Sequence, residues 1–262
     1  TLGSTISVTA CYWKNSEKVD LGTEQGIAES IFVDKNNDVY VAGIYGALGG
    51  SDMRAAYWKN GVLTILSDEQ SYGFSIYVYN GKVYVAGSSA TSALYWVDGV
   101  KHELSTNNAI AMGLFVYNGD VYVSGTTGNM ANPVYWVNDK EVALTDGSVP
   151  SIVTSIYVRN GVVYTAGLYG IETSSVVYWK NAIDASSKAE MISLPVGSYT
   201  AKLDMSLLMF GAIPKIFVDE DNNVYATSSL LDPARSTYIG AYWYNGSLTP
   251  NEEAIYSSVF VE

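Results

Sequence analysis

Two residue types on which much enzyme chemistry depends are nearly missing from this sequence. There is one cysteine, Cys11, so no internal disulfide framework can form. There is one histidine, His102, whereas a catalytic triad needs a histidine that a partner side chain orients. We interpret Cys11 as a small buried hydrophobe and His102 as a solvated side chain on an outer strand. On these grounds we assign no catalytic residue and expect neither a cofactor nor a metal.

Positive charge and long hydrophobic runs are also scarce. The chain has 14 Lys and Arg against 26 Asp and Glu, which gives a net charge of −12 and a pI of about 4.4. An acidic surface repels phosphate groups, so nucleic acid and anionic membrane surfaces are poor partners. No apolar run approaches the roughly 20 residues that a membrane helix needs, so we expect no membrane insertion. Because the chain starts at Thr1 rather than Met, we expect a mature product from which a leader was removed.

Tyrosine is abundant, and the tyrosines reveal an internal repeat. Each of the six tryptophans directly follows a tyrosine, and successive pairs are 45, 38, 40, 43 and 64 residues apart. Two further motifs interleave with them: S-I-(F/Y)-V, as at 30–33 and 75–78, and V-Y-V-A-G, as at 39–43 and 83–87. The six tryptophans are Trp13, Trp58, Trp96, Trp136, Trp179 and Trp243. Chance does not place all six in one phase of one repeat, so the repeat defines the architecture.

Each repeat predicts four short antiparallel strands. S-I-(F/Y)-V and V-Y-V-A-G form the first two strands, the Tyr-Trp pair lies in the third, and a segment such as V-L-T-I-L at 62–66 forms the fourth. Asn-Gly pairs, as at 60–61 and 80–81, separate consecutive strands and favour type I′ hairpin turns, because both residues accept positive φ. Four antiparallel strands about every 40 residues are typical of a β-propeller blade.

The two ends of the chain complement each other in this scheme. The chain begins with a third strand and ends with V-F-V at 259–261, a first strand without its successors. We therefore predict one all-β domain over 1–262: a six-bladed β-propeller of four-stranded antiparallel blades, whose C-terminal strand completes the N-terminal blade and closes the ring. The six blades are expected over 258–262 plus 1–29, 30–74, 75–113, 114–154, 155–214 and 215–257.

The repeat unit S-I-F-V-D-K-N-N-D-V-Y-V-A-G…A-A-Y-W-K-N-G resembles two groups of proteins. Its layout is similar to that of the NHL-repeat propellers, and it looks closer still to bacterial proteins built from tandem YWKNG and DVYVAG repeats, mostly uncharacterised. The resemblance covers nearly the whole chain but rests on scaffold residues, so it implies a propeller and an exported protein rather than an activity. In some NHL-type lyases histidines bind metal in the channel; with His102 alone, this chain does not match that pattern.

The tyrosines outside the repeat motifs are the candidates for ligand binding. The Tyr-Trp pairs recur in phase in every blade, so we interpret them as packing between blades. The loops that vary between blades are expected on one face, the top, where function is commonly found. Tyrosine combines a flat apolar ring with a hydroxyl, which suits sugars and peptides, although scattered surface tyrosines are the alternative. The predicted ligand-binding residues are Tyr45, Tyr72, Tyr169, Tyr199, Tyr238 and Tyr256, with Arg54 and Arg235.

Two acidic turns, at 34–38 and 219–223, are spaced like the first half of a calcium loop. However, Val39 and Val224 stand where such a loop needs a glycine for its sharp turn, and no glutamate follows at its last position. Asx-rich hairpin tips explain the same residues. We favour the hairpin interpretation, and calcium binding stays open.

The sequence favours a non-enzymatic binding or scaffold propeller outside the cytoplasm, whether periplasmic, cell-surface or secreted. Its expected partner is a glycan or a peptide or protein held by the top loops, or a surface assembly if it is a scaffold. The alternative is a glycosidase-like or lyase-like enzyme with paired carboxylates at the top of the central channel, about 5–10 Å apart. The acidic side chains available for such a pair are Asp52, Glu172, Asp204 and Asp232.

Overall fold

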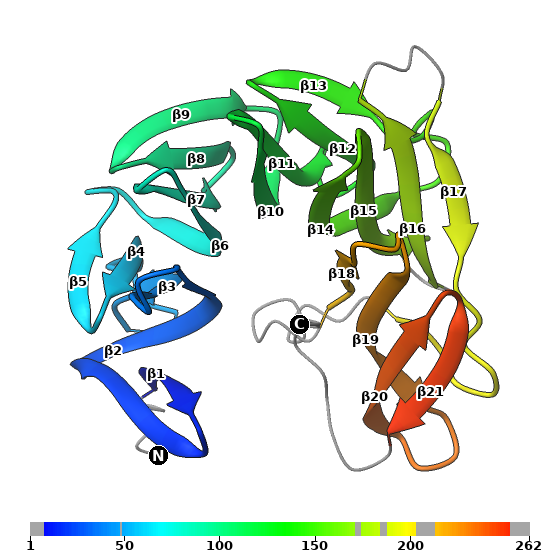
Figure 1. Cartoon of the computed structure of the whole chain (residues 1–262), viewed down its shortest axis with the longest axis horizontal. Coiled ribbons are helices and arrows are strands. Elements are labelled where there is room, and N and C mark those ends of the chain that lie inside the picture. The colour runs from blue at the N-terminus through cyan, green and yellow to red at the C-terminus, as the bar shows by residue number, and fades with distance from the viewer. Residues whose placement is uncertain (1–7, 48, 171–173, 184–187, 203–212, 252–262) are drawn as a thin grey trace. The chain divides into compact units, whose positions relative to one another are not determined.

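The computed structural model is all-β and describes residues 8–47, 49–170, 174–183, 188–202 and 213–251 (Figure 1). The chain divides into two compact units, residues 1–111 and residues 112–262. Within the described residues, no helix has the length and hydropathy needed to cross a membrane.

The first unit contains two antiparallel sheets. In both, strands that follow each other in the chain are neighbours in the sheet. The five-stranded sheet contains β1 (Thr9–Lys14), β2 (Glu17–Val33), β3 (Val39–Tyr45), β4 (Arg54–Lys59) and β5 (Val62–Ile65). The four-stranded sheet contains β6 (Ser71–Tyr79), β7 (Lys82–Ser89), β8 (Ala93–Val97) and β9 (Val100–Ser105).

The second unit contains three four-stranded antiparallel sheets with the same consecutive order. The first contains β10 (Ile110–Tyr117), β11 (Asp120–Thr127), β12 (Asn132–Val137) and β13 (Lys140–Ala143). The second contains β14 (Ser151–Arg159), β15 (Val162–Tyr169), β16 (Ser175–Ala182) and β17 (Glu190–Ser193). The third contains β18 (Lys215–Val218), β19 (Val224–Asp232), β20 (Thr237–Tyr244) and β21 (Ser247–Asn251). The predicted class, an all-β propeller of four-stranded antiparallel blades, is confirmed.

The described residues form five blades, not the predicted six. The Tyr12-Trp13 strand, β1, pairs with the beginning of β2, and β2 runs on without interruption to pair with β3. The predicted N-terminal blade is therefore a hairpin continuous with the first sheet, because one 17-residue strand serves both. Trp13 is 64% exposed, whereas the other five tryptophans are 0–4% exposed. The inner strand predicted at 259–261 lies outside the described residues, as does the ring closure that it was expected to provide.

The predicted hairpin turns are confirmed by backbone geometry. In the turn after the third strand, Asn60 and Gly61 have φ values of 49° and 82°. In the turn after the first strand, Asn80 and Gly81 have 49° and 77°. Both residues of each pair lie in the left-handed region, as a type I′ turn requires.

The asparagine or aspartate that follows the Tyr-Trp strand also fastens two strands together. The Asn60 side-chain oxygen accepts a hydrogen bond of 2.9 Å from the backbone N–H of Val39, the first residue of β3. The same contact recurs in three other blades, from Val83 to Asp98 (2.9 Å), from Val121 to Asn138 (2.9 Å) and from Val224 to Asn245 (2.8 Å). The Y-W-K-N-G motif thus joins the third turn of a blade to its second strand.

The glycine of V-Y-V-A-G lies where the inner strand comes too close for a side chain. At Gly43 a β-carbon would meet the Ile27 carbonyl oxygen at 1.9 Å, and at Gly87 it would meet that of Tyr72 at the same distance. The inner strands have register shifts at this point, between Ala28 and Ser30 in the first blade. The glycine is therefore required by the bulge in the neighbouring strand.

Neighbouring blades are joined by aromatic and apolar packing and by the serine of the S-I-(F/Y)-V motif. In the first unit Trp96 of β8 is fully buried in a cluster that includes Tyr40 of β3 and Ile76 of β6. The Ser30 hydroxyl accepts a hydrogen bond of 3.3 Å from the N–H of Ile76, one blade further along. In the second unit Ser155 accepts the equivalent bond of 3.2 Å from Ile216. These contacts confirm that the Tyr-Trp strands belong to the frame.

Candidate functional site

A bulge in β2 opens a pocket in the first unit. Thr9 pairs with Gln25 and Cys11 pairs with Asp20, so residues 21–24 of β2 lie opposite Ala10 alone. Gly22, with φ of 140°, lies within this bulge and adopts a backbone conformation that side chains disfavour. A space of about 230 Å³ lies beside this bulge, lined in part by Leu21, Gly22 and Glu24.

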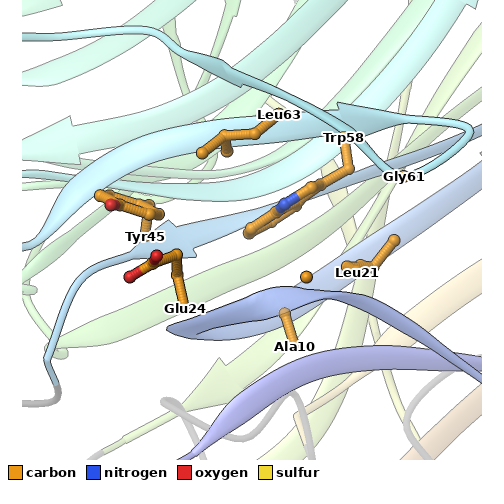
Figure 2. A pocket seen from close by; sticks show the side chains of 8 residues that line it. Ala10, Leu21, Glu24, Tyr45, Trp58, Gly61 and Leu63 are labelled. Atoms are coloured by element: carbon orange, nitrogen blue, oxygen red, sulfur yellow. The ribbon is translucent and has the colours of Figure 1, made fainter.

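The pocket has an apolar side and a polar side (Figure 2). Trp58 of β4 extends its indole toward the middle of the pocket, and Leu21 and Ala10 lie on one side of it. On the other side the Glu24 carboxylate lies beside the ring of Tyr45. Glu24 is exposed and Tyr45 is half-buried, so both can contact a solute that enters from solvent. Gly22, Gly61 and Leu63 complete the lining.

Of the predicted binding residues in the first unit, only Tyr45 lines this pocket. Arg54 lies opposite Tyr45 in the β3–β4 ladder, but its guanidinium donates to the carbonyl oxygens of Ser51 (2.9 Å) and Met53 (3.0 Å). It therefore braces its own loop. Tyr72, on β6, has its ring parallel to that of Phe74, with centroids 6.2 Å apart.

In the second unit a short segment links the ends of two sheets, and three of the predicted tyrosines belong to it or pair with residues near it. Thr200 exchanges two backbone hydrogen bonds with Leu231 (2.9 and 2.8 Å), and the next residue, Ala201, forms a bridge with Ser174. The segment 199–201 thereby connects the end of β19 with the start of β16. Tyr199 begins this segment, Tyr238 pairs with Leu231, and Tyr169 pairs with Ser175. All three tyrosines are half-buried. Tyr256 lies outside the described residues.

Of the four acidic residues considered for catalysis, the structure describes two, Asp52 and Asp232, one in each unit. Asp52 is exposed in the first unit. Asp232, in the second unit, is buried. Its carboxylate accepts hydrogen bonds from the N–H groups of Ala234 (2.9 Å) and Arg235 (3.4 Å). It also forms an ion pair of 3.7 Å with the Arg235 guanidinium. These contacts shape a turn. Glu172 and Asp204 lie outside the described residues.

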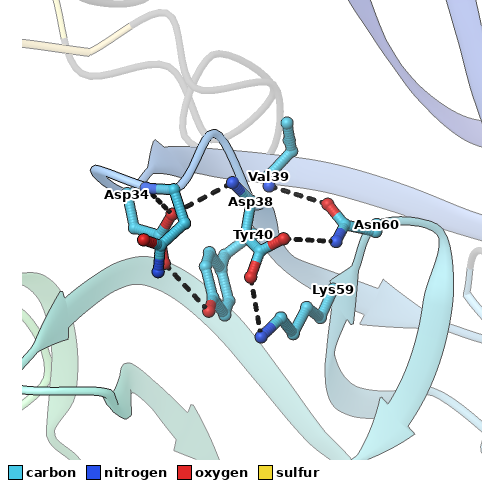
Figure 3. A network of polar contacts seen from close by, with 7 residues as sticks. Asp34, Asp38, Val39, Tyr40, Lys59 and Asn60 are labelled. Atoms are coloured by element: carbon cyan, nitrogen blue, oxygen red, sulfur yellow. Dashed lines mark hydrogen bonds and ion pairs between the residues drawn. The ribbon is translucent and has the colours of Figure 1, made fainter.

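The acidic turns at 34–38 and 219–223 use their first aspartate as a turn-forming acceptor. Figure 3 shows the first of these turns, with Asp34. Asp34 accepts hydrogen bonds from the N–H groups of Asn36 (2.8 Å) and Asp38 (3.0 Å), and Asp219 accepts them from Asp221 (3.0 Å) and Asn223 (2.8 Å). These are Asx-turn contacts. In the described part of the chain, no group of three or more His, Cys, Asp or Glu is arranged to hold a metal ion.

The second turn also has a perturbed tyrosine. The Tyr225 hydroxyl donates a hydrogen bond of 2.9 Å to the Asp219 carboxylate, and this bond raises the pKa of Tyr225 to about 12. Burial raises the pKa of the Asp219 carboxyl, but hydrogen bonds from Asn223, Tyr225 and Asp221 outweigh it and the net shift is downward. The turn is thus held by a charged acceptor.

The remaining two interpretations from the sequence have mixed outcomes. His102 lies on β9, the outer strand of its blade, as predicted, but its ring is stacked on Tyr95 with centroids 4.5 Å apart. Cys11 is half-buried rather than buried, because β1 is a strand at the edge of its sheet.

Sequence reasoning missed Glu24 and the side of Trp58 that lines the pocket. Glu24 belongs to no repeat motif, and Trp58 was assigned wholly to the frame. One signal was available: Gly22 and Gly26 flank Glu24 in the middle of an otherwise strand-forming stretch, and glycine inside a strand indicates a bulge.

No protein-family profile matches the sequence, and no curated protein does. Solved structures match its fold. A chain of the nidogen/laminin complex aligns with a TM-score of 0.50 and 10% identity, over 88% of this chain and 89% of the matched one. Domains 1–2 of Drosophila Semaphorin 1a align with a TM-score of 0.50 and 10% identity, over 86% of this chain and 54% of the matched one. At such identities the likeness concerns the fold alone.

Other solved structures that match are named as glycoside hydrolases. Bacteroides ovatus GH43B, from a xyloglucan PUL, aligns with a TM-score of 0.46 and 11% identity, over 91% of this chain and 56% of the matched one. Further matches with hydrolase names have TM-scores of 0.38 to 0.45, and this chain spans 61% of the length of one of them. With TM-scores below 0.5, these likenesses carry no argument about this chain.

Proposed function

We propose that this propeller recognises carbohydrate at the pocket beside Tyr45. The observation that supports this is the arrangement of an aromatic ring, a carboxylate and an apolar wall around a single space of about 230 Å³. The face of Tyr45 would stack on the C–H face of a sugar ring, and Glu24 would accept hydrogen bonds from its hydroxyls. Sites that hold drug-sized ligands have volumes of about 300–1,000 Å³. The smaller volume of this pocket suits one sugar unit.

Carbohydrate recognition is common to both functions that the sequence predicts, a binder and a glycosidase. Several solved structures with a similar fold are named as glycoside hydrolases, but their TM-scores are too low to support the glycosidase. Glycoside hydrolysis commonly needs two carboxylic groups, about 5–5.5 Å apart for retention or 6.5–9.5 Å for inversion. Among the described residues that line the pocket, Glu24 is the one acidic side chain. This favours binding without hydrolysis.

The binding proposal is tested with a glycan array, followed by calorimetry with the oligosaccharides that bind. Tyr45→Ala is expected to weaken binding at least tenfold, and Glu24→Gln to weaken it less. Tyr169→Ala, which changes a half-buried tyrosine of the second unit, is the matched control and should bind as the wild type does. Loss of binding in Tyr169→Ala but not in Tyr45→Ala would contradict the pocket, and an array without any binding would contradict carbohydrate recognition.

The alternative is tested on the same protein with chromogenic glycosides and the oligosaccharides that bind. Binding without release of product supports the non-enzymatic function. Product release that is abolished in Glu24→Gln would instead make Glu24 a catalytic carboxylate and require a second one beyond the described residues that line the pocket.

A further inference from the structure

Five hairpin turns of the described chain contain an Asn-Gly pair, but their asparagine side chains are not held alike. The Asn60 side chain is fixed at both ends, because its oxygen accepts a hydrogen bond from the Val39 N–H (2.9 Å) and its amide donates one to Asp38 (2.8 Å). Asn245 makes the two equivalent contacts, of 2.8 and 2.9 Å. The Asn160 amide donates one hydrogen bond, of 2.9 Å, to the neighbouring blade.

Asn80 and Asn118 lie in the same kind of turn without such contacts. Both are exposed, and neither side chain forms a hydrogen bond with another described residue. Their φ values, 49° and 53°, match the 49° of Asn60, so the difference lies in the side-chain contacts and not in the backbone. The glycines that follow, Gly81 and Gly119, face open space, since a β-carbon at either would have no atom within 4 Å.

We propose that Asn80 and Asn118 are sites of spontaneous deamidation, with water as the co-reactant. The backbone nitrogen of the following glycine loses its proton to hydroxide and attacks the side-chain carbonyl carbon of the asparagine. The new C–N bond closes a succinimide ring, the bond to the side-chain nitrogen breaks, and this nitrogen takes a proton from water and leaves as ammonia. Water then opens the ring at either carbonyl, which yields aspartate or isoaspartate.

The hydrogen bonds of the other asparagines oppose this reaction. The asparagine side chain must rotate until its carbonyl carbon meets the next backbone nitrogen, and glycine favours the approach because it has no side chain and a permissive backbone. At Asn60 the rotation breaks two hydrogen bonds, of which the one to the Asp38 carboxylate is of the stronger, charge-assisted kind. At Asn80 and Asn118 it breaks none with a described residue. One sequence motif is therefore protected in some blades and reactive in others.

The two products have different consequences for the hairpin. Aspartate fits the turn, since Asp98 precedes Gly99 in another hairpin of this protein with a φ of 49°. Isoaspartate lengthens the main chain by one carbon, so the two-residue turn no longer matches the pairing of Tyr79 with Lys82 across it. Either product adds a negative charge to a chain whose net charge is already −12.

The test incubates the whole protein at mildly alkaline pH and follows each Asn-Gly pair by mass spectrometry of its peptides. Aspartate and isoaspartate are expected to form at least tenfold faster at Asn80 and Asn118 than at Asn60 and Asn245, with Asn160 between them. The protein unfolded in guanidinium chloride is the control, in which all five pairs should react at similar rates. Equal rates at the five pairs of the folded protein, or no reaction at Asn80 and Asn118 while the unfolded chain reacts, would overturn the proposal.

Asp38→Ala tests whether the hydrogen bonds provide the protection. It removes the acceptor of the Asn60 amide, so deamidation at Asn60 should become at least threefold faster while the rate at Asn80 stays unchanged. Asp68→Ala, which changes an exposed carboxylate of the same unit, is the matched control and should alter neither rate. An unchanged rate at Asn60 in Asp38→Ala would overturn the proposal. An equal rise at Asn80 would overturn it too, because lost stability and not the lost contact would then be responsible.

Discussion

Ser124 occupies the space that a side chain at Gly113 would need. The β-carbon that Gly113 lacks would lie 2.6 Å from the Ser124 hydroxyl oxygen and 3.0 Å from the amide nitrogen of Ile156. In three other blades the inner strand carries a serine opposite an alanine of the second strand: Ser30 and Ala42, Ser75 and Ala86, Ser155 and Ala166. In the blade that contains Gly113, the small residue is on the inner strand and the serine, Ser124, is on the second strand. The serine and the small residue have therefore exchanged strands.

This exchange predicts that substitutions at the two positions are strongly coupled. Gly113→Ser alone is expected to destabilise the protein by about 1–3 kcal/mol, because it overpacks a fully buried site. Adding Ser124→Ala removes the closest obstructing atom and restores the pairing of the other blades, so most of the loss should be recovered. Urea unfolding of the two single variants and the double variant measures the coupling. Simple addition of the two single effects would contradict the relationship.

Gly87 is expected to tolerate no side chain. In Gly87→Ala the β-carbon would lie 1.9 Å from the carbonyl oxygen of Tyr72, a backbone atom that cannot move without breaking the β6–β7 ladder. We expect destabilisation of more than about 3 kcal/mol, or failure to fold. Gly81→Ala is the matched control: it has open space but a φ of 77°, so it should cost about 1–2 kcal/mol. Thermal unfolding of both variants compares the destabilisation caused by a steric clash, in Gly87→Ala, with that caused by a positive φ, in Gly81→Ala.

The side chain of Asn60 is expected to stabilise the first blade beyond its role in the turn. Asn60→Gly keeps the positive φ but removes both the acceptor of the Val39 N–H and the donor to the Asp38 carboxylate, so we expect a loss of about 0.5–1.5 kcal/mol. Asn80→Gly changes an asparagine with the same φ of 49° that has no side-chain hydrogen bond within the described residues. Denaturant unfolding should show a smaller change for Asn80→Gly, and equal changes would mean that the contacts of Asn60 with Val39 and Asp38 together contribute nothing.

The fold could be predicted largely because its signals are local and repeated. Asn-Gly turns need positive φ in each blade separately, and the Tyr-Trp pairs fix the third strand by their phase alone. The blade count could not be obtained in the same way. It depends on whether the Trp13 strand, β1, belongs to a separate sheet. It does not, because β2 pairs first with β1 and then, as the same strand, with β3. A repeat motif identifies a strand but does not say which sheet it joins.

The candidate site was predicted less well, because it depends on a departure from the repeat. Tyr45 could be found as a tyrosine outside the motifs, but its neighbour Glu24 approaches it only through the bulge at residues 21–24. Arg54 shows the opposite error. It was predicted to bind a ligand, but its guanidinium donates hydrogen bonds to carbonyl oxygens of its own loop. Side-chain direction in irregular segments follows from backbone contacts that residue types alone do not specify.

Acid is expected to weaken the contact between Asp38 and its neighbours. The Asn60 amide donates a hydrogen bond of 2.8 Å to the Asp38 carboxylate and Lys59 lies 3.0 Å away, and both hold the pKa of this carboxyl below its usual value (Figure 3). A carboxyl whose pKa is lowered by folding stabilises the protein above the unfolded pKa of about 4, and the contribution disappears as the pH falls through the lower folded value. Asp38→Asn should therefore lower the free energy of unfolding at pH 7, and this difference should shrink as the pH falls below about 4. Asp68→Asn, a change to an exposed carboxylate of the same unit, is the control, and a pH-independent effect of Asp38→Asn would show that lost packing, not charge, is responsible.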